Sequence, residues 1–250
     1  MDPPLSGQIL DNLCMRLAKV STATACWNLF LLGIRNTYMK GLYPLMPLGT
    51  GSRIVGRAVT LRYVPFREDV DAAIKPEDRL HQAYRLAIES LESGDVLVID
   101  AMGNLDAGAL GDILAARIKY RGALAVVVDG AVRDGPLIRQ VGLPAFVRGV
   151  HPAAGPRAIM SMDAHLPIQC GGVLVMPGDL ILADDEGVVV VPTALAESVA
   201  AKGVEQEDLE LFIRRRVEQG VSIQEAYPPS ERVKAEHEAE RREQSVGQGV

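Results

Sequence analysis

Two acidic residues and one arginine are spaced so that they could form a single site. Asp112 is followed by twenty residues and then by the adjacent pair Arg133-Asp134. The segment between them predicts a short helix over 113–120 and, after a glycine stop, a continuous apolar strand over 123–128. A helix and a strand of this length can bring their outer ends together, with Asp112 at the helix N-terminus. Two carboxylates and a guanidinium at a helix N-terminus would suit a divalent cation and a carboxylate-bearing substrate.

The segments on both sides predict one α/β domain with helices at each end. Apolar periodicity and β-branched runs mark the elements. A charged loop is expected from Pro65 to Pro76, and short β runs with Gly/Asp turns, typical of a barrel-like β unit, are expected over 162–192. Strands are expected at 53–64, 96–100, 123–128 and 143–147, and helices at 7–33, 79–91, 113–120 and 193–216.

These elements divide the chain into three parts. We expect an N-terminal helical and loop arm at 1–50, an α/β catalytic domain at 51–193 and a C-terminal helical extension at 194–250. From Pro228 onward the chain is charged and poor in large apolar residues, so a solvated helix or a disordered tail is expected there.

Composition excludes several classes of protein. Hydrophobic residues make up 48% of the 250 residues, which is enough for a sizeable core, and aromatic residues only 4%. The net charge is −6 with no basic block in the first 200 residues, so no nucleic-acid partner is expected. Cys14, Cys26 and Cys170 are odd in number and lack metal-site spacing, which favours reduced thiols. We see neither a signal peptide nor an apolar run of ~18 residues, and expect a soluble, cytoplasmic protein without membrane contact.

A block of the sequence resembles a known family. The residues GDVLVIDAMGNLDAGALGDILAARIKYRGALAVVVDGAVRD, then LPAFVRG and PGDLILADDEGVVVVP, are similar to the class II pyruvate aldolases that act on 4-hydroxy-4-methyl-2-oxoglutarate and 4-carboxy-4-hydroxy-2-oxoadipate. The same family includes the regulator of ribonuclease activity A, which lacks the second aspartate of the Arg-Asp pair. The segments LGIRNTYMKGLYPLMP and FRED resemble a longer-chain, regulator-like subgroup whose chemistry the resemblance does not define. The resemblance implies a swivelling β/β/α domain and a homotrimer or homohexamer with sites between subunits.

The resemblance also implies roles for individual residues. Arg133 matches the arginine that binds the carboxylate and keto oxygen of pyruvate, and its rigid fork of donors suits a planar 2-oxo acid. Asp134 matches the metal ligand, and a lone carboxylate with several waters suits Mg²⁺ or Mn²⁺. Asp112 matches the carboxylate that orients a water on the metal or relays protons. After Gly111, the backbone N–H groups of Ile113 and Leu114 match those that hold the pyruvate carboxylate.

Other polar residues could line the same site or serve only the fold. Asp100 could line the cleft or cap the next turn, and Gly103-Asn104 predicts a tight turn that could lie near substrate. The run Asp184-Asp185-Glu186 is better explained by a hairpin turn than by a metal site. His151, in a Gly/Pro loop, is better explained as structural than as an acid or base. The charged residues near the FRED loop could be surface residues or could contact the distal end of a substrate: Arg62, Arg67, Glu68 and Asp69.

The pattern favours a metal-dependent carbon–carbon lyase. Aldol cleavage or oxaloacetate-type decarboxylation of a small 2-oxo acid would pass through a pyruvate enolate, which a cation and Arg133 would stabilise. Two alternatives stay open. One is a non-catalytic regulator that binds and inhibits a ribonuclease, and the other is a hydratase or tautomerase that acts on a sugar-derived acid. The intact Arg133-Asp134 pair favours the enzyme over the regulator.

Overall fold

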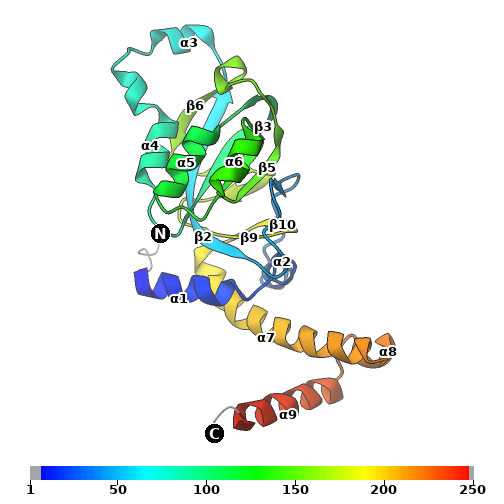
Figure 1. The fold of residues 1–250 in the computed structure, drawn as a ribbon. Helices are drawn as coiled ribbons and strands as arrows, with labels where there is room; N and C mark the ends of the chain where they lie inside the picture. Colours follow the sequence, from blue (N-terminus) through cyan, green and yellow to red (C-terminus); the bar gives the residue numbers. More distant parts are fainter. Residues whose placement is uncertain (1–6, 248–250) are drawn as a thin grey trace.

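The computed structural model describes residues 7–247 and has a mixed sheet at its centre (Figure 1). Seven strands follow the order β1-β5-β4-β3-β2-β9-β10, and β6 also pairs with β2. The four strands β2 to β5 are parallel, whereas β1, β6, β9 and β10 join antiparallel. A separate hairpin is formed by β7 and β8. The strands are β1 (Tyr43–Pro44), β2 (Ile54–Pro65), β3 (Asp95–Gly108), β4 (Ala125–Val132), β5 (Ala145–Val150), β6 (Ile159–Ala164), β7 (Ile168–Cys170), β8 (Val173–Val175), β9 (Leu180–Asp184) and β10 (Gly187–Val191).

The helices fall into three groups. One face of the parallel strands is covered by α4, α5 and α6, while α1, α2 and the first half of α7 pack beside β9 and β10, and α3 stands at the opposite end (Figure 1). The helices are α1 (Gly7–Leu17), α2 (Thr22–Leu31), α3 (Glu68–Ala73), α4 (Ala83–Ser90), α5 (Asp112–Tyr120), α6 (Gly135–Val141), α7 (Thr193–Glu218), α8 (Ile223–Ala226) and α9 (Glu231–Gly247), with 3₁₀ turns η1 (Asp78–His81) and η2 (Gly155–Arg157).

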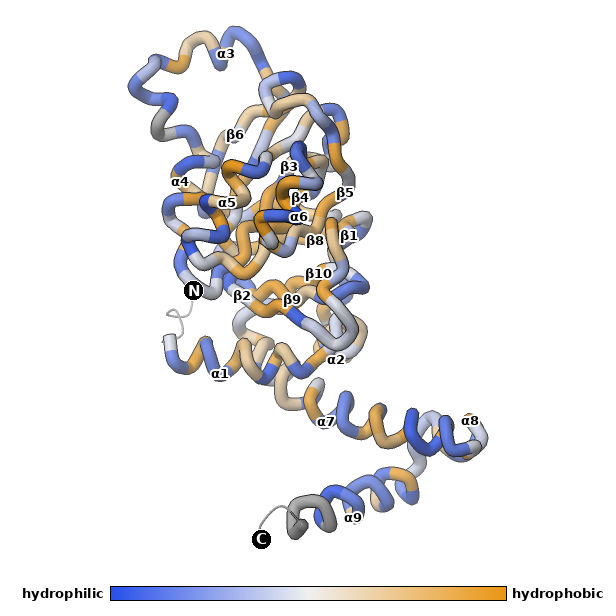
Figure 2. The backbone as a smooth tube through the Cα atoms, in the orientation of Figure 1, coloured by the Kyte–Doolittle hydropathy of each residue, from blue (hydrophilic) through white to orange (hydrophobic). Residues whose placement is uncertain are grey.

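Three apolar cores follow from side-chain alternation along the strands. Leu97 and Ile99 of β3 face the core under α4, α5 and α6, whereas Val96 and Val98 face a second core that includes β7 and β8. In β10, alternate valines face the second core and a third core under α1, α2 and α7. Figure 2 shows the central strands mostly orange, consistent with burial on both faces.

The predicted α/β class is confirmed, and the observed elements correct the sequence prediction at two internal segments. The charged loop predicted from Pro65 to Pro76 contains the short helix α3. Strand β3 was expected to end near Ala101, but it continues to Gly108. It continues through two irregularities in its pairing with β4, at Asp100/Asn104 and Asn104/Gly108. Gly103-Asn104 therefore lies inside this irregular strand, where the Asn104 side chain accepts hydrogen bonds from the N–H groups of Asp106 and Ala107.

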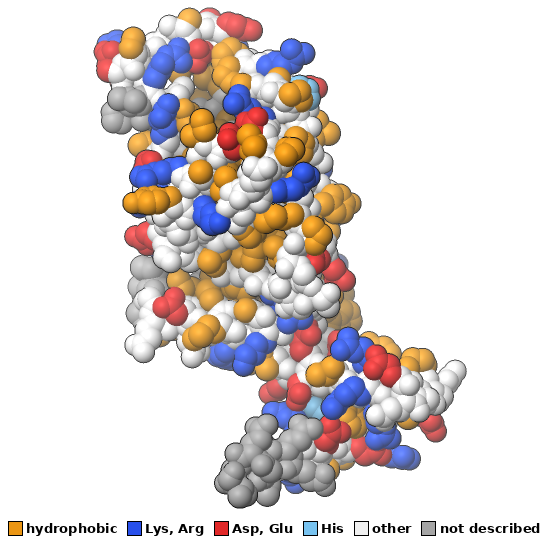
Figure 3. Space-filling view, viewed as in Figure 1, with side chains coloured by type: hydrophobic (Ala, Val, Ile, Leu, Met, Phe, Trp, Pro, Cys, Tyr) orange, Lys and Arg blue, Asp and Glu red, His pale blue; other side chains and the backbone are white. Residues whose placement is uncertain are grey.

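Of the two alternatives expected for the C-terminal segment, the structure shows the helix, because residues 231–247 form α9. Helix α7 projects from the body and α9 returns alongside its outer half (Figure 1). Salt bridges join the two helices, Arg216 to Glu236 at 3.1 Å and Arg215 to Glu240 at 2.7 Å. The His237 ring packs on Phe212, with 5.3 Å between ring centroids. Figure 3 shows many charged side chains on this projecting arm. Interhelical contacts thus stabilise a helix in a segment whose polar composition left a disordered tail equally open.

Within residues 7–247, no helix combines the length and the apolar character that a membrane span needs.

Candidate active site

The structure brings Gly111, Arg133 and Asp134 into direct contact. Gly111 is the N-cap of α5, and Arg133 and Asp134 lie between β4 and α6. Arg133 Nε donates to Asp134 Oδ2 at 2.8 Å. A Cβ added to Gly111 would lie 2.7 Å from Asp134 Oδ2 and 3.0 Å from Arg133 Nε. Only a residue without a side chain leaves these two groups where they are, which gives a steric reason for glycine at the position before Asp112.

Asp134 has an unusual backbone conformation. Its φ of 58° and ψ of 33° lie in the left-handed region, which non-glycine residues seldom occupy but aspartate tolerates better than most. Its carbonyl oxygen accepts the first hydrogen bonds of α6, from the N–H groups of Leu137 and Ile138 at 2.8 and 2.9 Å. Such conformations gather at functional sites, where the surrounding structure maintains the strain. The turn presents the Asp134 carboxylate, which is 30% exposed, beside the Arg133 guanidinium.

The N-terminus of α5 opens into a cavity of about 410 Å³. Asp112, Ile113, Leu114 and Arg133 all line this cavity. The first hydrogen bond within α5 runs from the Ala115 N–H to the Gly111 carbonyl at 3.0 Å, so the N–H groups of Ile113 and Leu114 precede the helical hydrogen-bond ladder. An anion placed there would meet these donors and the positive end of the helix dipole.

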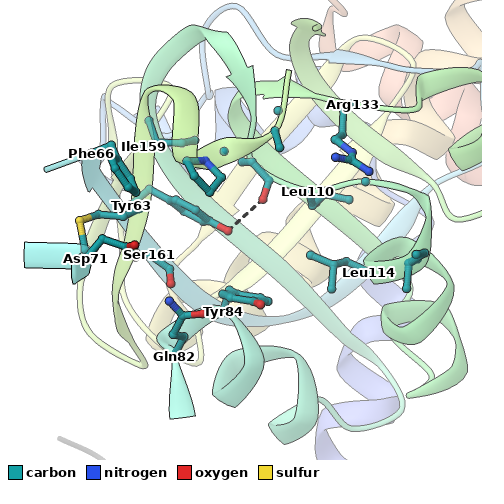
Figure 4. A pocket seen from close by; sticks show the side chains of 18 of the residues that line it. Tyr63, Phe66, Asp71, Gln82, Tyr84, Leu110, Leu114, Arg133, Ile159 and Ser161 are labelled. Atoms are coloured by element: carbon teal, nitrogen blue, oxygen red, sulfur yellow. Dashed lines mark hydrogen bonds between the residues drawn. The ribbon is translucent and has the colours of Figure 1, made fainter. Parts of the chain in front are cut away.

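Figure 4 shows how the cavity extends from this end. Arg133, Leu110 and Leu114 lie at one end, whereas the other end is formed by side chains from β2, β6 and the segment around α3 and α4. The Tyr63 hydroxyl donates to the Ala109 carbonyl at 2.9 Å, which joins the two ends of the cavity wall. Burial raises the pKa of Tyr63 well above its usual value, so this hydroxyl stays a protonated donor. We define the distal wall as six residues at the end of the cavity opposite Arg133: Tyr63, Phe66, Asp71, Gln82, Tyr84 and Ser161.

Sequence reasoning missed the distal wall. Tyr63 lies two positions after Leu61 on β2, and both face the core under α4, so strand alternation from Leu61 could have identified it. No comparable signal marks Phe66 or Asp71, because the segment that carries them reads as a charged loop. Their position depends on how residues 66–82 fold over the end of β2, which involves contacts distant in sequence.

The charged residues near the FRED loop lie outside the cavity lining. Arg62 pairs with Asp163 on the neighbouring strand β6, and Arg67 pairs with Asp69 in its own loop. Hydrogen bonding from Arg67 lowers the pKa of Asp69. Neither pair is among the residues that line the cavity, so the surface explanation fits these residues better than substrate contact.

Three other candidates serve the fold. Asp184, in the β9–β10 hairpin, accepts hydrogen bonds from the backbone and hydroxyl of Thr22 and from the Glu186 N–H. Its neighbour Asp185 accepts from the N–H groups of Leu48 and Gly49, so the run serves the hairpin and its contacts, as predicted. His151 Nδ1 accepts from the Ala153 N–H within its loop.

Asp100 belongs to a second polar cluster, on the sheet face opposite the cavity. It accepts from the Met102 N–H, as a turn cap would, and from Gln169 Nε2. The neighbouring Asp129 is 1% exposed in its side chain and pairs with Arg148. Asp129 also accepts from Gln169 Nε2 and from the Gly171 N–H. Burial, with a smaller effect of Asp129, raises the pKa of Asp100. This cluster ties the carboxyl ends of three parallel strands to the β7–β8 hairpin.

The sequence is similar to known proteins over most of its length. The family model described as "RraA-like: Aldolase/RraA" matches residues 9–190. A protein of Halalkalibacterium halodurans named "Putative 4-hydroxy-4-methyl-2-oxoglutarate aldolase" is 32% identical over 183 residues, which is 73% of this chain and 80% of that protein. Protein DlpA of Legionella pneumophila is 30% identical over 222 residues, which is 89% of this chain but 34% of DlpA. The chain therefore spans about a third of DlpA.

A solved structure extends the likeness to the fold. RraAS2 of Streptomyces coelicolor, described as "an unusual member of the RNase ES inhibitor RraA protein family", is 35% identical and superposes with a TM-score of 0.74. The match covers 86% of this chain and 99% of RraAS2, and it confirms the swivelling β/β/α fold that the family resemblance implied, with the expected C-terminal helix. Since the family model also covers most of its length, the chain belongs to the Aldolase/RraA family.

Proposed function

We propose that this protein is a divalent-metal-dependent carbon–carbon lyase, which cleaves or decarboxylates small 2-oxo acids through a pyruvate enolate. The observation that carries the proposal is the close packing of Gly111 on Arg133 and Asp134 at the N-terminus of α5. An aldolase name on one relative supports it. A trimer or hexamer stays an expectation from the family resemblance.

The pyruvate part of the substrate would bind between α5 and Arg133. The N–H groups of Ile113 and Leu114 would hold its carboxylate, since they precede the helical ladder at the cavity wall. Figure 4 shows the Arg133 guanidinium pointing toward the side of the cavity formed by Leu110 and Leu114. Its Nε bond to Asp134 fixes the plane of the guanidinium, which would present its other donors to the keto oxygen and to the enolate oxygen that forms from it.

The residues present fit a magnesium-type ion. Asp134 offers a partly exposed carboxylate, and Asp112 supplies a second carboxylate in the adjoining cavity. Mg²⁺ commonly uses one or two protein carboxylates together with waters and substrate oxygens. Within residues 7–247, no group of three or more His, Cys, Asp and Glu side chains is arranged to enclose a metal ion. A cation held by Asp134 would polarise the keto and carboxylate oxygens of the substrate.

The protein's own groups can account for the proton movements. In aldol cleavage, Asp112 would accept the proton of the 4-hydroxyl group directly or through a water, while the C3–C4 bond breaks to give a carbonyl product and the pyruvate enolate. The enolate would then take this proton at C3 from Asp112 or its water, which regenerates the base, and leave as pyruvate. Oxaloacetate needs no such base, because loss of CO₂ from the same bond gives the same enolate. Arg133 would stabilise both reactions, by roughly 3–4 kcal/mol if it acts as oxyanion donors do elsewhere.

A direct test is pyruvate release from oxaloacetate and from 4-hydroxy-4-methyl-2-oxoglutarate, with Mg²⁺ and with a chelator. We expect release with Mg²⁺ and its loss with chelator. Arg133→Lys keeps the charge but loses the planar fork, so kcat should fall by roughly 10²-fold. The free energy of unfolding should change by less than about 1 kcal/mol, because the side chain is 40% exposed. Arg139→Lys, at an exposed arginine of α6 outside the cavity lining, is the matched control.

Two results would contradict the proposal. One is near-normal turnover in the Arg133→Ala variant. The other is unfolding of this variant, which would show that the arginine is structural.

A second candidate function is inhibition of a ribonuclease by contact, which the description of RraAS2 favours. If the protein is a regulator of that kind, its Arg133→Ala variant should inhibit the ribonuclease as well as the wild-type protein does. Neither form should release pyruvate.

A further inference from the structure

The cavity is larger than pyruvate requires. At about 410 Å³ it lies within the range of pockets that hold drug-sized ligands, whereas pyruvate has only three carbons. If pyruvate occupies the end near Arg133, the distal wall contacts whatever is attached beyond C3. The chemistry of this wall therefore bears on the substrate class, an inference that rests on the proposed function.

Aromatic rings dominate the distal wall. Although aromatic residues are only 4% of the chain, Tyr63, Phe66 and Tyr84 all line this end of the cavity. The Tyr63 hydroxyl is already bonded to the Ala109 carbonyl, so the wall presents its ring and not a free hydroxyl. Ile159 and Met160 of β6 add aliphatic surface beside it. Such a wall favours contact with a flat or branched apolar group.

The distal charges neutralise each other. Among the described residues that line the cavity, the two cations are Arg133 and Arg79. Arg79 contacts Asp71 through both terminal nitrogens, with Nη1 to Oδ1 at 3.3 Å and Nη2 to Oδ2 at 3.1 Å. Arg79 Nη2 also donates to the Asp71 carbonyl at 3.1 Å. A substrate carboxylate at this end would meet the Asp71 carboxylate and an arginine that is already paired, which disfavours its binding.

We propose that the distal wall selects 2-oxo acids with an uncharged aromatic or branched apolar group at C4, and that the Arg79–Asp71 pair disfavours a second carboxylate. The corresponding aldol substrate is a 4-hydroxy-2-oxo acid that cleaves to pyruvate and an apolar aldehyde. Cleavage breaks the C3–C4 bond, moves the hydroxyl proton to the base and returns a proton to C3, as for any substrate of this type.

Binding separates this inference from catalysis. The matched probes are 2-oxo-4-phenylbutanoate and 2-oxoglutarate, which differ only in a phenyl group or a carboxylate at C4. Calorimetric titration of the full chain with each probe, in Mg²⁺, should show at least about tenfold tighter binding of the phenyl compound. Equal affinities, or tighter binding of 2-oxoglutarate, would overturn the inference whether or not the protein releases pyruvate from any substrate.

Three variants locate the selectivity. Asp71→Asn removes the partner charge of Arg79, so affinity for 2-oxoglutarate should rise several-fold, and Asp71→Asn combined with Arg79→Gln should reverse this gain. Phe66→Ala should weaken binding of the phenyl compound more than binding of 2-oxoglutarate. Asp71 lies on the short helix α3, which has no buried residues, so circular dichroism should show an intact fold. No change in the ratio of the two affinities in any of these variants would also refute the assignment.

Turnover distinguishes the two proposals. The proposed function predicts pyruvate release from oxaloacetate. The further inference predicts that 4-hydroxy-2-oxo-4-phenylbutanoate is cleaved to benzaldehyde and pyruvate with higher kcat/KM than 4-hydroxy-2-oxoglutarate is cleaved to glyoxylate and pyruvate. Decarboxylation of oxaloacetate combined with a preference for 4-hydroxy-2-oxoglutarate would refute the inference and leave the proposed function standing. Tighter binding of the phenyl probe with no pyruvate release would support the selectivity and refute the lyase.

Discussion

A single methyl group at Gly111 tests whether the proposed site depends on the close packing of α5 against Arg133 and Asp134. The added Cβ would lie 2.7 Å from Asp134 Oδ2 and 3.0 Å from Arg133 Nε, whereas ordinary contact begins at 3.4 Å. The carboxylate oxygen must therefore retreat by about 0.7 Å and the guanidinium nitrogen by about 0.4 Å. Gly111 has a φ of −123° and a ψ of −171°, extended backbone that alanine adopts freely, so the substitution changes spacing without straining the backbone.

We expect a loss of rate with little loss of stability. Displacing a catalytic group by about 1 Å can cost roughly 10²-fold, so Gly111→Ala should lower kcat for oxaloacetate decarboxylation by about 10- to 100-fold. The Arg133 and Asp134 side chains are 40% and 30% exposed and can move toward solvent. Alanine also restricts the unfolded chain, which offsets part of the cost. The free energy of unfolding should therefore change by less than about 1 kcal/mol.

The assay compares steady-state decarboxylation with urea unfolding of the same preparations. Gly7→Ala is the matched control, because a Cβ at Gly7 meets nothing within 4 Å. A Gly111→Ala variant with a kcat within about threefold of the wild-type value would contradict this expectation, since the tight contact would then have no bearing on transition-state stabilisation. A loss of several kcal/mol in stability would instead show that the contact serves folding.

Three other side chains, Asp134, Asp129 and Asp100, have contacts whose effects can be measured by substitution. Asp134→Asn should weaken Mg²⁺ binding and lower the lyase rate with the fold intact; unchanged Mg²⁺ affinity by calorimetry would exclude Asp134 as a ligand. Asp129→Ala should lower the free energy of unfolding in urea by about 3 kcal/mol, because it leaves Arg148 and the Gly171 N–H without their carboxylate partner and removes one of the two acceptors of Gln169 Nε2; a loss below about 1 kcal/mol would show that the cluster contributes little. Burial raises the pKa of Asp100 above its unfolded value, so the folded state carries a penalty at neutral pH that is relieved as pH falls through the folded pKa. Asp100→Asn should therefore stabilise the protein more at neutral than at acidic pH relative to wild type, and a difference that is independent of pH would contradict this.

Much of the fold could be predicted from local pattern. The helix over 113–120 and the strand that begins after Gly122 are strongly periodic, and they appear as α5 and β4. This unit also carries the spacing from Asp112 to Arg133, so the sequence located the end of the sheet where the cavity lies. The roles assigned to these residues stay predictions, because proximity to a cavity does not test chemistry.

The rest depended on contacts distant in sequence. The residues after Ala101 contain glycine and asparagine, which locally predict a turn, yet β3 continues to Gly108 because β4 pairs with it across two irregularities. The distal wall needed the fold of residues 66–82 over β2, and the packing of α9 needed the partner charges and aromatic ring of α7. Each case is one in which tertiary contacts override local composition.

Alternation along two strands explains how a cavity and an ion-pair cluster lie on opposite faces of the same end of the sheet. Leu97 and Ile99 on β3 face the core beneath the cavity, while Asp100 faces the other side, and on β4 Val128 and Asp129 divide in the same way. Because Asp129 is buried and bonded to Arg148, Gln169 and the Gly171 N–H, it holds the strand ends from behind. Rigid supports of this kind limit the movement of groups on the opposite face. Arg133 follows Asp129 by four residues, so the cluster supports the end of β4 from which the proposed enolate-binding arginine projects.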